Sequence, residues 1–204
     1  MIKLYHLNQS RSLRIMWLLE EIGVAYELCA YQRNSETFLA PEALKEIHPL
    51  GKAPMLEIDG QLITESAAIV EVLCQRYAPQ MLPAKENSAE AMAHLQLMHF
   101  AEGSAMTPLL LGIYTSRLGE AAAPLQPRIR SETKNHFDYM EAQLRPSGHF
   151  VLDDLSAVDV MMLFPAQAAV HRLGLSEAYP KLTAYVAAIE ARPAFQRALA
   201  RDNG

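Results

Sequence analysis

An acidic residue and a hydroxyl, Glu65 and Ser66, stand side by side directly before a run with helical spacing that starts at Ala67. A helix start exposes backbone N–H groups that have no partner within the helix, so it binds a carboxylate well. A glutamate beside it can pair with an ammonium group. Ser66 is predicted to be the N-cap of this helix. The pair therefore suits the two charged ends of a small zwitterionic ligand.

A turn and a hairpin lead into this pair. Gly51 relaxes the backbone where the chain turns, and Pro54 fixes its own φ and gives up a donor. The Asp59-Gly60 pair separates the apolar run 55–58 from Leu62-Ile63, a pattern that predicts a β-hairpin. Taken alone, the segment fits an ordinary hairpin followed by a capped helix better than it fits a ligand site.

The elements that must position these groups follow a simple order. Up to residue 77 the chain predicts strand, helix, strand, short helix, strand, strand and helix. The first strand is expected at 2–7, followed by the polar loop Asn8–Ser12 and a helix at 13–22 that ends at Gly23. Apolar residues give that helix a buried face, whereas Arg14 is predicted to point outward. The order fits a small α/β sandwich whose first crossover makes a parallel strand pair.

The rest of the chain predicts helices only. A linker is expected at 79–87, and Ser88 is predicted to cap a helix that runs to about Leu118, with a kink or break at Pro108. The segment Ser156–Asp159 fits a capping box in which aspartate replaces the usual glutamate or glutamine. Its aspartate is therefore interpreted as a structural residue rather than a catalytic one.

Composition argues against several classes of protein. Half of the 204 residues are hydrophobic, which allows one or two domains with sizeable cores. A net charge of −5, without a basic patch that carries aromatic residues, argues against a nucleic-acid partner. No apolar stretch approaches the length of a membrane span and no signal peptide is recognisable, so we expect a cytoplasmic protein with no membrane partner.

The remaining reactive side chains are two cysteines, Cys29 and Cys74, and seven histidines. There is no C-x-x-C pair, so the first half carries no dithiol of its own, and each cysteine is interpreted as a small core residue. The histidines do not have the spacing of metal ligands, and no metal is predicted.

Three motifs together resemble the cytosolic glutathione transferase family: Ser10-Arg11-Ser12, Leu50-Gly51-Lys52-Ala53-Pro54 and Thr64-Glu65-Ser66. The G-K-x-P turn paired with the E-S pair at this spacing is the most diagnostic feature. The run Ser10 to Glu21 is most similar to bacterial and fungal members, and the likeness covers nearly the whole chain. It implies an α/β thioredoxin-like N-terminal domain at 1–78, a linker at 79–87 and an all-α C-terminal helical domain at 88–204.

The resemblance also implies roles at a glutathione site. Pro54 matches the family's cis-proline, which turns the Ala53 backbone toward glutathione, although cis is the rarer form of X-Pro bonds in general. Glu65 and Ser66 match the pair that holds the γ-glutamyl ammonium and carboxylate. Lys52 matches a lysine near the glycyl carboxylate. Glutathione is thus the implied co-substrate.

Ser10 is the leading candidate for the catalytic hydroxyl. The reaction needs glutathione as a thiolate, and a hydrogen bond from a hydroxyl at a helix N-terminus favours that charged form. Arg11 would add positive potential, and Ser12 or Asn8 could donate instead, although Ser12 also suits a helix cap. Tyr5 is a weaker alternative because it lies inside the predicted strand.

The implied function is the transfer of glutathione to an apolar electrophile, in a homodimer that serves detoxification. Candidate residues for the electrophile site, each of which fits bundle packing equally well, are Met98, Gly103, Met106, Leu110 and Tyr114. Two alternatives stay open. One is a glutathione-dependent disulfide or peroxide reductase on the same fold. The other is a non-enzymatic binding module, which the intact glutathione motifs disfavour.

Overall fold

The computed structural model describes residues 1–202, and the chain divides into two compact units. The first unit contains Met1–Gln80 together with the C-terminal segment from Ile189, and the second contains Met81–Ala188. The division falls at the start of the predicted linker, 79–87. The C-terminal helix differs from the prediction, because it belongs to the α/β unit and not to the helical half of the chain.

Four strands form the sheet of the first unit, in the order β2-β1-β3-β4. β1 (Ile2–Leu7) is parallel to β2 (Glu27–Tyr31), as the predicted crossover requires, and antiparallel to β3 (Met55–Ile58). β3 and β4 (Gln61–Ile63) form the predicted hairpin. Its turn residues, Asp59-Gly60, have φ values of 52° and 78°, as a two-residue type I′ turn requires.

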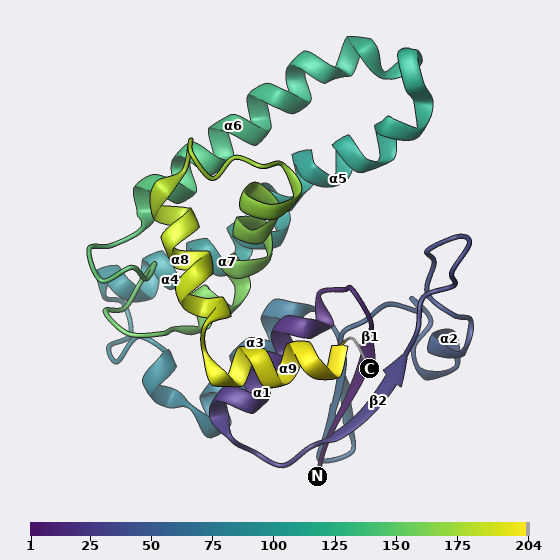
Figure 1. Cartoon of the computed structure of the whole chain (residues 1–204). Coiled ribbons are helices and arrows are strands. Elements are labelled where there is room, and N and C mark those ends of the chain that lie inside the picture. The colour runs from purple at the N-terminus through teal and green to yellow at the C-terminus, as the bar shows by residue number, and fades with distance from the viewer. Residues whose placement is uncertain (203–204) are drawn as a thin grey trace. The chain divides into compact units, whose positions relative to one another are not determined.

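Helices cover both faces of this sheet (Figure 1). α1 (Ser12–Ile22), α3 (Ser66–Tyr77) and α9 (Pro193–Asp202) lie on one face, and the short α2 (Ala43–Ile47) lies on the other. Side chains alternate between the two faces of a strand. Leu7 therefore packs with Leu44 of α2, whereas Leu4 and His6 belong to the face that α1 covers.

α1 ends as predicted but is buried on more sides than predicted. Gly23 has a φ of 78°, and its N–H donates to Leu19 O at 3.0 Å. The prediction that Arg14 points outward was wrong, because this side chain is buried. α1 packs against α9 as well as against α3 and the sheet, so it has less free surface than a helix with one buried stripe.

Charged contacts fix the C-terminal segment on α1. Arg192 pairs with Glu21, and Arg197 Nε donates to Glu20 Oε2 at 2.9 Å. Burial alone would raise the pKa of Glu21, but the hydrogen bonds from Arg192 and Trp17 outweigh it and hold the pKa below its ordinary value. The carboxylate is therefore charged at neutral pH, and these contacts tie the C-terminal segment to α1.

The second unit is helical (Figure 1). Its longer elements are α4 (Ala89–Phe100), α5 (Met106–Thr115), α6 (Gln126–Gln143), α7 (Ala157–Gln167) and most of α8 (Pro180–Glu190). Ser88 caps α4 as predicted, since its hydroxyl accepts from Ala91 N at 3.1 Å. Ser156 and Asp159 form the predicted capping box at α7. None of the helices within residues 1–202 is both long enough and apolar enough to span a membrane.

The predicted kink or break at Pro108 takes the form of a change in helix type. A π-helical segment, η2 (Ala101–Ala105), joins α4 to α5 just before this proline. Proline lacks the N–H that would bond the carbonyl four residues earlier, and π turns accommodate such gaps. The helix then ends at Thr115 instead of near Leu118, and the 3₁₀ segment η3 (Ser116–Leu125) follows.

Candidate functional site

The three polar segments singled out in the sequence meet at one edge of the sheet. β1 ends at Leu7, and the loop Asn8–Ser12 leaves from there. The antiparallel register of β1 and β3, continued past the strand ends, places Leu7 opposite Ala53. The register of β3 and β4, continued in the same way, places Glu65 opposite Pro54. The sheet therefore gathers a polar loop, a proline turn and a helix start at a single edge.

The turn before β3 has the geometry that the family resemblance implied. The Ala53–Pro54 peptide bond is cis. Ala53 is half-buried against the apolar cluster between the sheet and α2, whereas Lys52 is exposed. Gly51 has a φ of 55°, and a Cβ at this position would lie 2.6 Å from Lys45 Cγ, so both the conformation and the close approach require glycine.

The N-cap of α3 is Glu65 and not Ser66. The prediction that Ser66 is the N-cap was wrong, because Ser66 is itself the first helical residue and is buried. Glu65 is exposed and has a φ of 69° with a ψ of 118°, a region that side chains rarely enter. Such strain costs on the order of 1–3 kcal/mol and is concentrated at functional sites. The backbone thus holds a carboxylate in the open at a helix start.

Two buried serines of the Asn8–Ser12 loop share a hydrogen bond. Ser10 Oγ and Ser12 Oγ lie 2.8 Å apart, and Ser12 N donates to Ser10 Oγ at 3.2 Å. The Ser12 hydroxyl also contacts the N and O atoms of Leu7 at 3.1 and 3.0 Å. The reading of Ser12 as a helix cap was wrong, since Arg11 is the N-cap and has no side-chain cap bond. Ser12 is fully buried and Ser10 is 8% exposed, so Ser10 is the outer hydroxyl.

Arg33, which the sequence did not single out, fixes this loop from the end of β2. Its Nε donates to Asn8 O at 3.1 Å, its Nη2 donates to Gln9 O at 3.3 Å, and its backbone N donates to Asn8 Oδ1 at 2.8 Å. Burial lowers the pKa of Arg33, and the charge of Arg11 lowers it further. Two guanidinium groups therefore give the surroundings of Ser10 a positive potential. The sequence could have indicated Arg33 through the predicted topology, because β1 and β2 are parallel and parallel strands end at the same edge of a sheet.

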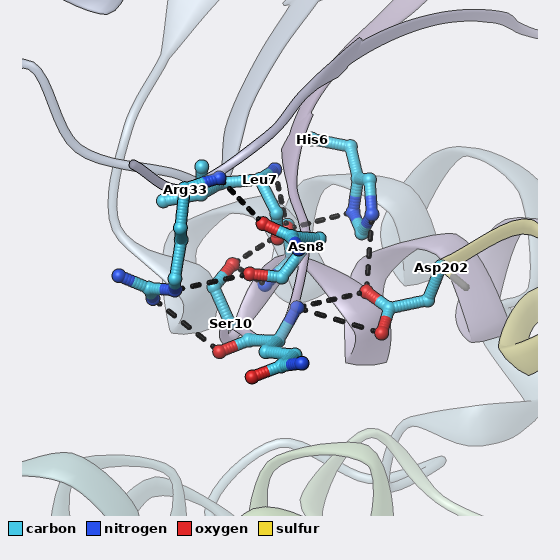
Figure 2. A network of polar contacts seen from close by, with 8 residues as sticks. His6, Leu7, Asn8, Ser10, Arg33 and Asp202 are labelled. Carbon is cyan, nitrogen blue, oxygen red and sulfur yellow. Dashed lines mark hydrogen bonds and ion pairs between the residues drawn. The ribbon is translucent and has the colours of Figure 1, made fainter. Parts of the chain in front are cut away.

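A buried histidine and a carboxylate extend the serine pair (Figure 2). His6 Nδ1 lies 2.8 Å from Ser12 Oγ. His6 Nε2 lies 3.1 Å from Asp202 Oδ1, without good hydrogen-bond geometry. Asp202 Oδ1 also accepts from Gln9 N at 3.2 Å. A histidine at a core-facing strand position was the sequence signal that we missed, and no local pattern links it to Asp202.

The helical unit places the predicted electrophile-site residues unequally. Met98 and Met106 are buried, Leu110 is half-buried, and Tyr114 is 64% exposed. Leu110 and Tyr114 are four residues apart on α5 and therefore share one face of it. Of the four side chains, these two are the ones that offer surface to a ligand, and their role stays a prediction.

A mainly apolar cavity of about 750 Å³ lies within the helical unit, between α5, α6 and the segment 172–179. This volume is typical of sites for small molecules. None of the five predicted electrophile-site residues lines it, so the sequence did not point to this cavity. Its lining includes Leu109, Ile113, Ile129, Leu175, Arg130, Lys134 and Arg172.

The two cysteine thiols lie on other elements than the Asn8–Ser12 loop. Cys74 is buried, and burial raises the pKa of its thiol to about 12, as suits a core residue. Burial also raises the pKa of Cys29, which is half-buried on β2. Within residues 1–202, no three His, Cys, Asp or Glu side chains are grouped so that they could hold a metal ion. The Asn8–Ser12 loop therefore offers hydroxyls and not a thiol for chemistry at the sheet edge.

Protein-family models match both halves of the chain. The model of the glutathione S-transferase N-terminal domain matches residues 1–74. The model of the glutathione S-transferase C-terminal domain matches residues 87–193. The second match stops where α9 begins, which agrees with the assignment of that helix to the α/β unit.

Individual relatives give the same result. Glutathione S-transferase 3 of Schizosaccharomyces pombe is 33% identical over 208 residues, which cover 95% of this chain and 85% of the relative. A solved glutathione S-transferase from Actinobacillus pleuropneumoniae is 31% identical with a TM-score of 0.88, over 100% of this chain and 94% of that one. A sphingomonad glutathione S-transferase, solved in complex with glutathione, is 25% identical with a TM-score of 0.77 over 98% of both chains.

Proposed function

Because the chain belongs to the glutathione S-transferase family, we propose that it activates glutathione as a thiolate and transfers it to apolar electrophiles. Both of the family's domains are matched, and the fold combines a thioredoxin-like α/β unit with a helical unit. In this proposal glutathione is the co-substrate, the α/β unit holds it, and the reaction uses no metal.

One observation carries the proposal: the cis turn at Ala53–Pro54, the strained Glu65 and the buried Ser10 hydroxyl all lie at one edge of the sheet. The backbone of Ala53 can bond the cysteinyl part of glutathione as an added strand would. Glu65 can pair with the γ-glutamyl ammonium of glutathione. Ser66 and the start of α3 can bind the γ-glutamyl carboxylate. Lys52 is exposed and suits the glycyl carboxylate.

Ser10 then acts on the sulfur. Its hydroxyl donates a hydrogen bond to the thiolate, and the positive potential of Arg11 and Arg33 favours the same charged form. The thiol proton leaves to solvent. The sulfur uses its lone pair to form a carbon–sulfur bond, and the electrophile's leaving group departs with the bonding electrons. A free thiol with a pKa near 8.5 is mostly protonated at neutral pH, so this activation is the chemical contribution of the site.

We further propose that the electrophile lies against the face of α5 that carries Leu110 and Tyr114. Tyr114 offers a large exposed aromatic surface, and Leu110 continues it one turn earlier along the helix. Met98 and Met106 are buried and shape the packing behind that surface. A mainly apolar surface of this kind suits varied apolar molecules.

Turnover of a dinitrohalobenzene, compared with turnover of a mixed glutathione disulfide, tests the proposed reaction. We expect the first to be the faster. A disulfide reductase needs an attacking thiolate, and the Asn8–Ser12 loop offers none, so a second glutathione would have to supply it. Faster turnover of the disulfide would favour the reductase. Failure to bind immobilised glutathione would favour the non-enzymatic binding module.

Replacing Glu65 separates the role of its charge from the strain of its backbone. Glu65→Ala and Glu65→Gly should each weaken glutathione binding by about tenfold to a hundredfold, the worth of one hydrogen bond to a charged group. Glycine ordinarily costs roughly 0.5–1 kcal/mol of stability relative to alanine. Here the Gly variant should be at least as stable as the Ala variant, because glycine adopts a φ of 69° without strain.

Calorimetric titration with glutathione and urea unfolding of both variants measure these two effects. Glu46→Ala, which removes an exposed carboxylate from α2, is the control and should change neither quantity. If the Ala variant bound glutathione as tightly as the wild type, Glu65 would not be the ammonium partner.

We also propose that the enzyme is a cytoplasmic homodimer that serves detoxification, as the family resemblance implies. Sedimentation velocity at micromolar concentration should give the mass of two chains. A single species of 22.7 kDa under these conditions would contradict the dimer.

A further inference from the structure

A buried chain of hydrogen-bonding side chains lies behind Ser10. The number of protons that this hydrogen-bonded chain carries limits the direction in which Ser10 can donate. The chain runs from Asp202 through His6 and Ser12 to Ser10, with successive contacts of 3.1, 2.8 and 2.8 Å (Figure 2). All four side chains are at most 8% exposed. Solvent is thus largely absent, and each hydrogen bond of the two hydroxyls must be met from within the protein.

Consider first a neutral His6. The carboxylate of Asp202 favours the tautomer that carries its proton on Nε2, which leaves Nδ1 as an acceptor. Ser12 then donates its single proton to Nδ1 at 2.8 Å, the shorter of its two acceptor contacts, the other being Leu7 O at 3.0 Å. Because the two hydroxyl oxygens are only 2.8 Å apart, Ser10 has to donate to Ser12. In this state the proton of Ser10 points into the protein and is not available to a sulfur atom.

A doubly protonated His6 reverses the chain. Nδ1–H and the N–H of Leu7 then fill both lone pairs of Ser12. Ser12 can donate its own proton to Leu7 O at 3.0 Å or to Ser10 Oγ at 2.8 Å, and only donation to Ser10 keeps a proton between the two hydroxyl oxygens. Ser10 already accepts from Ser12 N at 3.2 Å, and both of its own lone pairs are now filled. Its remaining proton has to point away from the chain, toward any sulfur bound at the sheet edge.

We propose that Asp202 and His6 are positioning residues that set the direction of the Ser10 hydroxyl, with the Asp202–imidazolium pair selecting the outward, thiolate-stabilising state. The inference rests on the proposed role of Ser10 in glutathione activation. Asp202 has a second part in the same task. It accepts from Gln9 N, and Gln9 is held at a φ of 49° directly before Ser10.

The charges near this chain come from several elements. Asp202 on α9 is the anion at His6, and it also raises the pKa of Arg33, against the larger lowering effects of burial and of Arg11. Ser12 faces His6 from the start of α1, and on β2 the register partner of His6 is Ala30, which carries no charge. The Asp202 carboxylate is thus the charged group in direct contact with the imidazole.

Two amide variants of His6 separate the two ends of the ring. An asparagine amide reaches about as far as Nδ1 and can donate to Ser12 without titrating. A glutamine amide reaches about as far as Nε2, so it can meet Asp202 but gives Ser12 no donor. His6→Gln should lower kcat by about tenfold to a hundredfold, the effect of one lost hydrogen bond to a charged group. His6→Asn should stay at least tenfold more active than His6→Gln.

Asp202→Asn is the matched change at the other end of the chain. Its amide oxygen can still accept from Gln9 N, but its charge at His6 is lost. We expect a fall in kcat similar to that of His6→Gln, again about tenfold or more. This variant also keeps the proposal testable if His6→Gln fails to fold.

The readouts separate positioning from simple structural damage. In both impaired variants KM for glutathione should stay within about twofold of wild type. Of the four side chains from Asp202 to Ser10, only Ser10 faces glutathione in the proposal. The ultraviolet titration of the bound thiol should move toward that of free glutathione. His99→Gln, an exposed histidine in the helical unit, should behave as wild type.

Equal activity of His6→Asn, His6→Gln and wild type would overturn the inference. If Ser10→Ala were inactive in the same assays, the proposed function would survive that failure. If Ser10→Ala were fully active, Ser10 would not be the catalytic hydroxyl, and this inference would fail together with the proposed role of Ser10.

Discussion

Ser10→Ala should lower kcat about a hundredfold and leave the affinity for glutathione within about twofold of wild type. The hydroxyl is expected to hold the pKa of the bound thiol about two units below that of free glutathione, which corresponds to roughly 2.7 kcal/mol. Alanine keeps the shape of the loop but has no donor for the sulfur. The groups proposed to hold the rest of glutathione, from Lys52 to Ser66, lie on other elements and keep their positions.

The loss of activity in Ser10→Ala should depend on pH. With Ser10 present, the thiolate forms above about pH 6.5, and kcat/KM should be high from there upward. Without the hydroxyl, kcat/KM should rise only through about pH 8.5, the ordinary range of a thiol. The loss should therefore be large at neutral pH and shrink above pH 9. Stopped assays with a dinitrohalobenzene from pH 5.5 to 9.5 measure both profiles.

Ser35→Ala is the matched control, because it removes an exposed hydroxyl from the same unit. Its rate and pH profile should equal those of the wild type. Thermal unfolding of both variants shows whether the fold is kept. A Ser10→Ala enzyme with full activity and an unchanged profile would transfer the catalytic role to Ser12 or Asn8, the alternatives in the same loop.

The local parts of the fold follow from the sequence because their causes are local. The Asp59-Gly60 hairpin, the Gly23 helix end and the Ser156 capping box each depend on a few adjacent residues and their backbone preferences. The cis peptide at Pro54 was different. General preferences favour trans, and the resemblance to a family motif carried that prediction.

The site was predicted in part, and the missing part is long-range. Asp202 lies nearly two hundred residues after His6, and no periodicity or spacing connects them. α9, which carries Asp202, packs against α1 and covers a second side of it. Arg14 on α1 is buried, although the hydrophobic pattern predicted it to be exposed. Ser66 was predicted one position too early in its helix. The strained backbone of Glu65, which moves the helix start, cannot be seen in residue types.

The helical unit has its own buried polar centre, at Asp159. Its side chain is fully buried and accepts three hydrogen bonds: from Ser156 N at 2.8 Å, from Ser156 Oγ at 2.6 Å and from Phe150 N at 3.1 Å. Ser156 Oγ in turn receives the N–H of Asp159 at 3.4 Å. The carboxylate therefore ties the start of α7 to the segment before it.

Asp159→Ala should destabilise the helical unit by about 3–5 kcal/mol, because it leaves two backbone N–H groups and a hydroxyl buried without an acceptor. Asp159→Asn should lose less, since its single oxygen can still accept from one side while its NH₂ group faces a donor on the other. Urea unfolding measures both, and Asp154→Ala, an exposed aspartate nearby, should unfold as wild type. If Asp159→Ala folds at low temperature, its kcat should be near that of the wild type. A large loss of activity in a stably folded variant would contradict the structural role and make Asp159 a catalytic candidate.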